Sequence, residues 1–204
     1  MEVVLNGETM TGTDNLGSLG SLLDTIQPTF PKGHIVSYMF VDGQEVLQNN
    51  ADALRDLDLN PVNEVRIQTA SLRAELGRAL VDLRQFIDEV IPSLEDAAFQ
   101  VRLGNVAPAS DMFSTCFEGI GLALRNMQEI YSAMPRVGVS PNDTEIGLFT
   151  SLDGASLDKI MTEYQTQNWR SVGELVRDDL VPVLRTWQPV FNQTSERLNA
   201  TPTA

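Results

Sequence analysis

Three carboxylates in the C-terminal half of the chain are the side chains best spaced for chemistry. Glu174 and Asp178 lie four positions apart, which puts them on one face of a helix, and Asp179 follows directly. Di-metal sites in helical bundles use such carboxylates together with Glu-x-x-His pairs, and the sequence has no such pair. Arg170 and Arg177 are close enough for ordinary helix ion pairs. We therefore expect a solvated acidic face, and an enzyme with a carboxylate-based site in this helical region is kept as an alternative.

The histidine and the cysteine of this chain offer little further chemistry. A catalytic zinc needs about three His, Cys or carboxylate ligands, whereas His34 and Cys116 are the one histidine and the one cysteine present. Cys116 falls at helical spacing among apolar residues, where cysteine behaves as a small hydrophobe. The sequence has no P-loop, no Gly-x-Ser-x-Gly elbow and no GxGxxG segment. We expect no catalytic residue, no metal and no cofactor, and hence a non-enzymatic protein.

Charge and hydropathy narrow the range of partners. The 204 residues include 28 Asp and Glu against 14 Lys and Arg, which gives a net charge of −14. Such a surface repels phosphate backbones and anionic lipid, so we expect neither nucleic-acid nor membrane binding. No stretch approaches the ~18 uninterrupted apolar residues of a membrane span, and the N-terminus lacks the regions of a signal peptide. These features predict a cytoplasmic protein.

Residues 1–70 have the pattern of short strands joined by tight turns. Asn6-Gly7 suits a type I′ turn, and Asp42-Gly43 marks a second hairpin after a β-branched and aromatic run. Between the hairpins, leucines at helical spacing predict a helix from Leu16 that ends before Pro28. A short helical turn over residues 51–59 and a last strand over residues 63–69 complete this part.

From Leu72 the apolar residues change from alternation to helical spacing, and Ser71 is a plausible N-cap. Pro92 is expected to kink or end the first helix, and residues 134–147 are rich in turn formers and predict a loop. Four amphipathic helices on short connections favour an antiparallel bundle. We therefore predict an α+β protein with an N-terminal domain over residues 1–70, a four-helix bundle over residues 71–193 and a flexible tail over residues 194–204.

The N-terminal element order (strand, strand, helix, strand, strand, short turn, strand) resembles the β-grasp, or ubiquitin-like, fold over residues 1–70. Sulfur carriers and protein modifiers of that fold end in an exposed Gly-Gly. Here the last strand runs through Thr69, Ala70 and Ser71 into a helix, and no free Gly-Gly exists. The resemblance therefore implies an interaction module.

The C-terminal part resembles a second family in two segments. Residues 67–76, "IQTASLRAEL", and residues 178–187, "DDLVPVLRTW", are similar to the ends of the flagellin export chaperones. These are small cytoplasmic four-helix proteins that wrap the C-terminus of flagellin around their outside. The resemblance covers residues 67–191 and implies a role in flagellar or secretion assembly, and no binding residues are carried over from it.

The predicted bundle helices have apolar faces wider than the contact stripe of a coiled coil, which takes about two residues in seven. Methionines are also concentrated in these helices, and methionine side chains adapt well to a partner helix. Trp169 and Trp187 are expected in the core. The candidate partner-binding residues are Phe113, Phe117, Met127, Tyr164 and Phe191.

These observations favour a cytoplasmic protein-binding adaptor or chaperone-like protein whose partner presents an amphipathic helix. The alternative is a structural homo-oligomer, in which a second copy covers the wide faces by self-association. Docking of the N-terminal domain on those faces is a further alternative.

Overall fold

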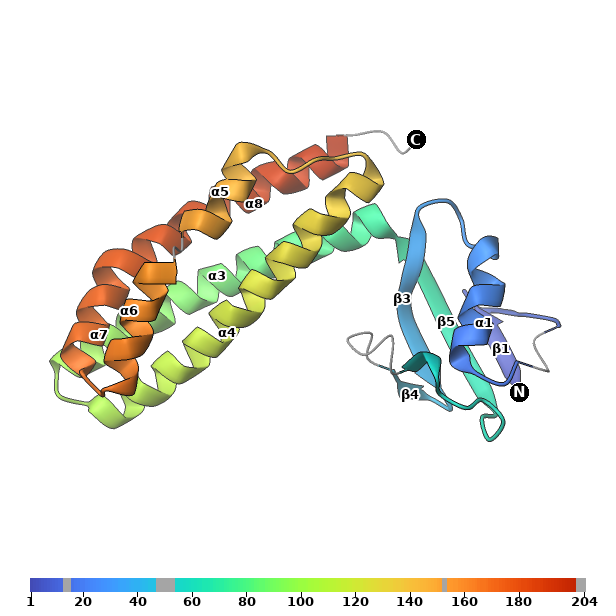
Figure 1. The fold of residues 1–204 in the computed structure, drawn as a ribbon, viewed down its shortest axis with the longest axis horizontal. Helices are drawn as coiled ribbons and strands as arrows, with labels where there is room; N and C mark the ends of the chain where they lie inside the picture. The colour runs from blue at the N-terminus through green and yellow to red at the C-terminus, as the bar shows by residue number, and fades with distance from the viewer. Residues whose placement is uncertain (13–15, 47–53, 152–153, 201–204) are drawn as a thin grey trace. The chain divides into compact units, whose positions relative to one another are not determined.

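The structure is a computed structural model that describes residues 1–12, 16–46, 54–151 and 154–200. Within these ranges the chain is α+β, as predicted: a five-stranded mixed sheet is followed by a region of long helices (Figure 1). The chain divides into two compact units, Met1–Glu75 and Leu76–Ala204. No helix in the described ranges is long and apolar enough to cross a membrane.

The sheet of the N-terminal unit has the strand order β2-β1-β5-β3-β4. The strands are β1 (Glu2–Leu5), β2 (Glu8–Thr9), β3 (His34–Val41), β4 (Gln44–Glu45) and β5 (Glu64–Ser71). Strand β5 lies at the centre, where it pairs in parallel with β1 and antiparallel with β3. The first and last parts of this unit therefore lie side by side.

Both predicted hairpins are confirmed. Strand β1 pairs antiparallel with β2, and β3 pairs antiparallel with β4. The turn residues Asn6, Gly7, Asp42 and Gly43 have φ values of 52°, 87°, 47° and 79°. A type I′ turn needs positive φ at both central residues, and Asn-Gly and Asp-Gly tolerate it best.

Helix α1 (Leu19–Ile26) supplies one side of the core of this unit. It begins later than the predicted Leu16, because the Ser18 hydroxyl caps it by accepting a hydrogen bond from the Ser21 amide at 3.3 Å. Pro28 lies in the 3₁₀ turn Gln27–Thr29 that follows. Of the predicted turn over residues 51–59, residues 51–53 lie outside the described ranges. The buried core comprises Val3, Leu5, Leu19, Leu22, Ile26, Met39, Leu59, Val65 and Ile67.

Strand β5 continues directly into helix α3 (Leu72–Arg102). Ser71 is the last residue of the strand and directly precedes the helix, and the Leu72 amide that follows it donates to the Gly33 carbonyl at 2.9 Å as the sheet ends. The Ser37 hydroxyl donates to Glu75 at 2.9 Å. The first turn of α3 thus belongs to the N-terminal unit, which ends at Glu75 and not at residue 70.

Pro92 lies inside α3 and does not end it. A proline in a helix interior costs ~3 kcal/mol. Its neighbours Val90, Ile91 and Leu94 are all buried, and each such side chain gains ~1.5–3 kcal/mol from burial. Their combined burial outweighs the cost, so the helix persists.

The C-terminal unit is built from helices of unequal length (Figure 1). After α3 come α4 (Val106–Ala133), the 3₁₀ turn η3 (Met134–Val137), α5 (Asp143–Ser151) and α6 (Gly154–Gln165). Helix α7 (Trp169–Leu175), the π-helical segment η4 (Val176–Leu180) and α8 (Val181–Ala200) then follow one another directly.

Helix α5 lies where the sequence predicted a loop. The Asn142 side-chain oxygen accepts from the Glu145 amide at 2.9 Å, and the Asn142 amide donates to the Glu145 carboxylate at 2.7 Å. This reciprocal arrangement is a capping box. The signal was present as Asn-x-x-Glu within a segment whose other residues are turn formers.

The predicted tail from residue 194 begins too early. Helix α8 continues to Ala200, and Thr194 and Leu198 within it are both fully buried. Their burial supplies the apolar contacts that a frayed end would lack. Residues 201–204 lie outside the described ranges.

Candidate functional site

Three of the five predicted partner-binding residues are interior residues. Phe113, Met127 and Phe191 are 0%, 0% and 1% exposed, so they pack inside the C-terminal unit and are not available to a partner in this conformation. The prediction of a surface site for these three is wrong, because the wide apolar faces cover one another within the unit. Phe117 and Tyr164 are half-buried.

Phe117 and Tyr164 belong to a row of aromatic rings that joins α4, α6 and α7. The ring centroids of Phe113 and Phe117 lie 5.7 Å apart, those of Phe117 and Tyr164 lie 5.6 Å apart, and those of Tyr164 and Trp169 lie 5.4 Å apart. The last two pairs meet edge to face, a favoured geometry for aromatic rings. The row is therefore part of the packing that holds these helices together.

Cys116 and Trp187 are buried, as predicted, and Trp169 is half-buried. Burial raises the pKa of the Cys116 thiol, which keeps the thiol neutral, whereas the thiolate is the reactive form. His34 is half-buried at the start of β3. It lies in the N-terminal unit and Cys116 in the C-terminal one.

Two of the three predicted carboxylates, Glu174 and Asp178, are engaged by the arginines beside them, whereas the Asp179 side chain makes no ion pair with another residue that the structure describes. Arg170 Nε lies 3.1 Å from Glu174, and Arg177 makes two hydrogen bonds of 2.7 Å to Asp178. These bonds lower the pKa of the Asp178 carboxyl, against a smaller opposing effect of desolvation. A general acid needs a raised pKa, so Asp178 is poorly suited to that role. No group of three or more His, Cys, Asp or Glu in the described part of the chain could hold a metal ion.

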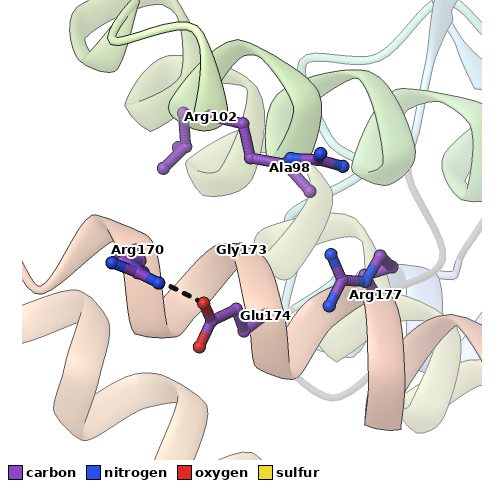
Figure 2. Close-up of a pocket in the computed structure, with 7 residues that line it drawn as sticks. Ala98, Arg102, Arg170, Gly173, Glu174 and Arg177 are labelled. Atoms are coloured by element: carbon purple, nitrogen blue, oxygen red, sulfur yellow. Dashed lines mark hydrogen bonds and ion pairs between the residues drawn. The ribbon is translucent and has the colours of Figure 1, made fainter.

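The same arginines line a cavity of about 400 Å³ between α3 and the α7–η4 segment (Figure 2). We call it the arginine cavity. It is lined by Ala98, Val101, Arg102, Arg170, Gly173, Glu174 and Arg177. Figure 2 shows Arg102 on one helix and Arg170, Glu174 and Arg177 on the helix that faces it.

Helical spacing and a close helix contact build this cavity. Arg170, Gly173, Glu174 and Arg177 follow one another at intervals of three, one and three residues, which places them on one face. Gly173 is buried against α3, and a Cβ added there would lie 3.6 Å from Ala98 Cα. Small residues thus form the narrow floor of the cavity, and long polar side chains form its rim.

The charge of the lining is opposite to that of the chain. Three guanidinium groups and the one carboxylate of Glu174 sum to 3 − 1 = +2, in a chain of net charge −14. The Arg102 side chain makes no hydrogen bond or ion pair with any other residue that the structure describes. The sequence indicated the Arg170–Arg177 segment, but no local pattern could place Arg102 across from it, because that meeting depends on how α3 packs.

Comparisons with models of protein families, with curated proteins and with solved structures find no match to this chain. The site is therefore interpreted from its geometry alone.

Proposed function

We propose that this chain is a non-enzymatic cytoplasmic protein-binding adaptor or chaperone-like protein that binds its partner through the exposed side of α3. One observation carries the proposal. Phe99 and Leu103 are 51% and 58% exposed. Phe99 lies in the last turn of α3, and Leu103 directly follows the helix, where its amide donates to the Phe99 carbonyl at 3.1 Å, so the two residues lie one turn apart at the end of α3. Single exposed apolar residues are ordinary on protein surfaces, but this pair offers a continuous contact.

We also propose a fold for each of the two units. The N-terminal unit is a β-grasp domain, which is supported by the order of its elements and by the single helix α1 packed on a mixed sheet. The C-terminal unit is an antiparallel helical bundle in which α5 and α6 together take the place of the third predicted helix. Both units serve as scaffolds for interaction.

The partner presents an amphipathic helix. Phe99 and Leu103 have the spacing at which the apolar side chains of one helix fit between those of another, and helix-to-helix docking of this kind is a common mode of peptide recognition. This surface replaces the buried residues Phe113, Met127 and Phe191 as the predicted contact. The resemblance to flagellin export chaperones names flagellar or secreted subunits as the partners to test first.

The test is a pull-down with Phe99→Glu and Leu103→Glu variants of the full chain. A charge on this surface is expected to abolish partner capture while the melting temperature stays unchanged, because both side chains are already solvated. The matched control is Val81→Glu, which adds the same charge at another exposed apolar position of α3 that is 51% exposed. Capture that survives both substitutions, or that is lost equally in the control, contradicts the proposal.

Light scattering on the same variants tests the homo-oligomer. If the wild-type protein is a dimer that Phe99→Glu dissociates and Val81→Glu does not, the occupant of this surface is a second copy and the adaptor proposal is wrong.

A further inference from the structure

We infer that the arginine cavity is a binding site for a small molecule carrying two oxyanion groups, held by the guanidinium groups of Arg102, Arg170 and Arg177. This site is separate from the apolar pair Phe99 and Leu103, and it does not depend on the proposed adaptor function. Its volume of about 400 Å³ is within the range of roughly 300–1,000 Å³ found for small-molecule sites.

Free hydrogen-bond donors are the first argument. Each guanidinium group has five N–H donors in a fixed plane. Arg170 donates to Glu174 through Nε, and Arg177 donates to Asp178 through Nε and Nη2. Arg102 has no partner in the described residues. Most of the donors around the cavity thus remain available, and guanidinium groups bind carboxylates and phosphates in a bidentate manner.

The placement of Arg102 is the second argument. Helix ion pairs explain why arginines occur at 170 and 177, because each has an acidic neighbour on its own helix. Arg102 lies in the last turn of α3, where the helix dipole favours a cation only weakly, and it lines the cavity opposite the other two. Three cations around one cavity repel one another, and a bound anion removes that repulsion.

The π-helical segment is an independent observation. Segment η4 begins at Val176, and its second residue is Arg177, which lines the cavity. A π-helical turn is rare, and it occurs frequently at functional sites because it realigns the side chains that follow it. Here the π-helical segment supplies Arg177, whereas Arg102 comes from α3 and Arg170 from α7.

The lining also limits the kind of ligand. Ala98, Val101 and Gly173 leave a narrow apolar floor, while the cations come from both sides. A molecule with two oxyanion groups joined by a short linker fits both features. Phosphoryl compounds and polycarboxylates share this chemistry, so pyrophosphate and citrate are the probes that separate the two sources.

The experiment is a calorimetric titration of the full chain with sodium pyrophosphate and, separately, with sodium citrate at fixed ionic strength. Saturable binding of either probe is expected. Arg102→Gln and Arg177→Gln should each weaken binding at least about tenfold. Arg125→Gln is the matched control, because Arg125 is an exposed arginine of α4 outside the cavity, and it should change affinity by less than about twofold.

A substitution that is expected to raise the affinity distinguishes a change at the site from damage to the fold. Glu174→Gln removes the carboxylate from the lining and frees Arg170, so it should strengthen binding several-fold, which a damaged protein could not do. The inference is overturned if neither probe binds, if Arg125→Gln weakens binding as much as Arg102→Gln does, or if Glu174→Gln weakens it. Binding of pyrophosphate alone assigns the site to phosphoryl ligands, and binding of citrate alone assigns it to polycarboxylates.

Discussion

Glu145 is the most buried charged side chain that the structure describes, at 1% exposed. Its Oε1 atom accepts hydrogen bonds from the Thr194 hydroxyl and from Arg197 Nη1, the latter at 2.6 Å, and its Oε2 atom accepts from the Asn142 amide at 2.7 Å. Arg197 also donates to the Ser140 carbonyl. This set of bonds fastens the start of α5 to α8.

Replacing Glu145 should therefore cost much more stability than replacing an exposed glutamate. We expect Glu145→Gln to lower the free energy of unfolding by ~2–3 kcal/mol, because the buried network loses its negative charge and one of its two acceptor oxygens while Arg197 keeps access to water. The exposed Glu129 of α4 is the control, and Glu129→Gln should stay within ~0.5 kcal/mol. Urea unfolding measures both. Equal effects would show that the network adds nothing.

Cys116 and Tyr131 should make the fold sensitive to alkali. Desolvation raises the pKa of both groups, and for Tyr131 it outweighs the opposing influence of Thr194, which lowers the pKa. The unfolded chain therefore loses these protons first, at about 8.5 for cysteine and about 10 for tyrosine. Stability is full below those values and falls as the pH rises above them.

The measurement is the urea midpoint between about pH 7 and about pH 10.5, across the unfolded pKa values. Tyr131→Phe should flatten the upper part of this profile, and Cys116→Ala the lower part. A midpoint that does not fall over this range, or that falls identically in both variants, would contradict the assignment.

At the scale of elements, the capping box of α5 gives a separate prediction. Asn142→Ala should destabilise the C-terminal unit by ~1 kcal/mol, the usual cost of losing an N-cap, whereas Asn142→Asp should retain most of the stability because aspartate caps equally well. Asn126→Ala on the exposed side of α4 is the control and should be neutral or slightly stabilising. Thermal unfolding followed by circular dichroism compares the three.

Elements governed by local chemistry were predictable from the sequence, and those governed by packing were not. Asn6-Gly7 and Asp42-Gly43 specify their turns through backbone preference alone, so both hairpins were found. The sequence predicted that Pro92 would kink or end the helix but could not decide between the two, because the choice depends on the burial of its neighbours. The partner-binding residues Phe113 and Phe191 were misplaced for a similar reason, since periodicity indicates that a helix has an apolar face but not whether other helices of the same chain cover it.

At the scale of the whole molecule, we predict that residues 1–75 fold without the rest of the chain. This unit has its own buried core on both α1 and the sheet, and its contacts separate it from Leu76–Ala204. The isolated fragment should melt cooperatively, and its amide chemical shifts should match those of the full chain except near the new terminus. A fragment without a cooperative transition would show that the two units depend on each other.

The fragment of residues 1–69 is the informative comparison. It lacks Leu72, whose amide bonds to Gly33, and Glu75, which accepts from Ser37. We expect it to be less stable than residues 1–75, since both bonds and the end of β5 are lost. Equal stability would place the boundary back at residue 70, where the sequence predicted it.

The direct passage from β5 into α3 also affects how this chain responds to a protease. Proteases cut chain segments that can become extended in their active sites, and domain boundaries are usually found because they lie in exposed loops. Here the boundary between Glu75 and Leu76 falls inside a helix whose residues on either side are hydrogen-bonded. Limited digestion would therefore leave this junction intact, and a map of cleavage sites would report the two units as one.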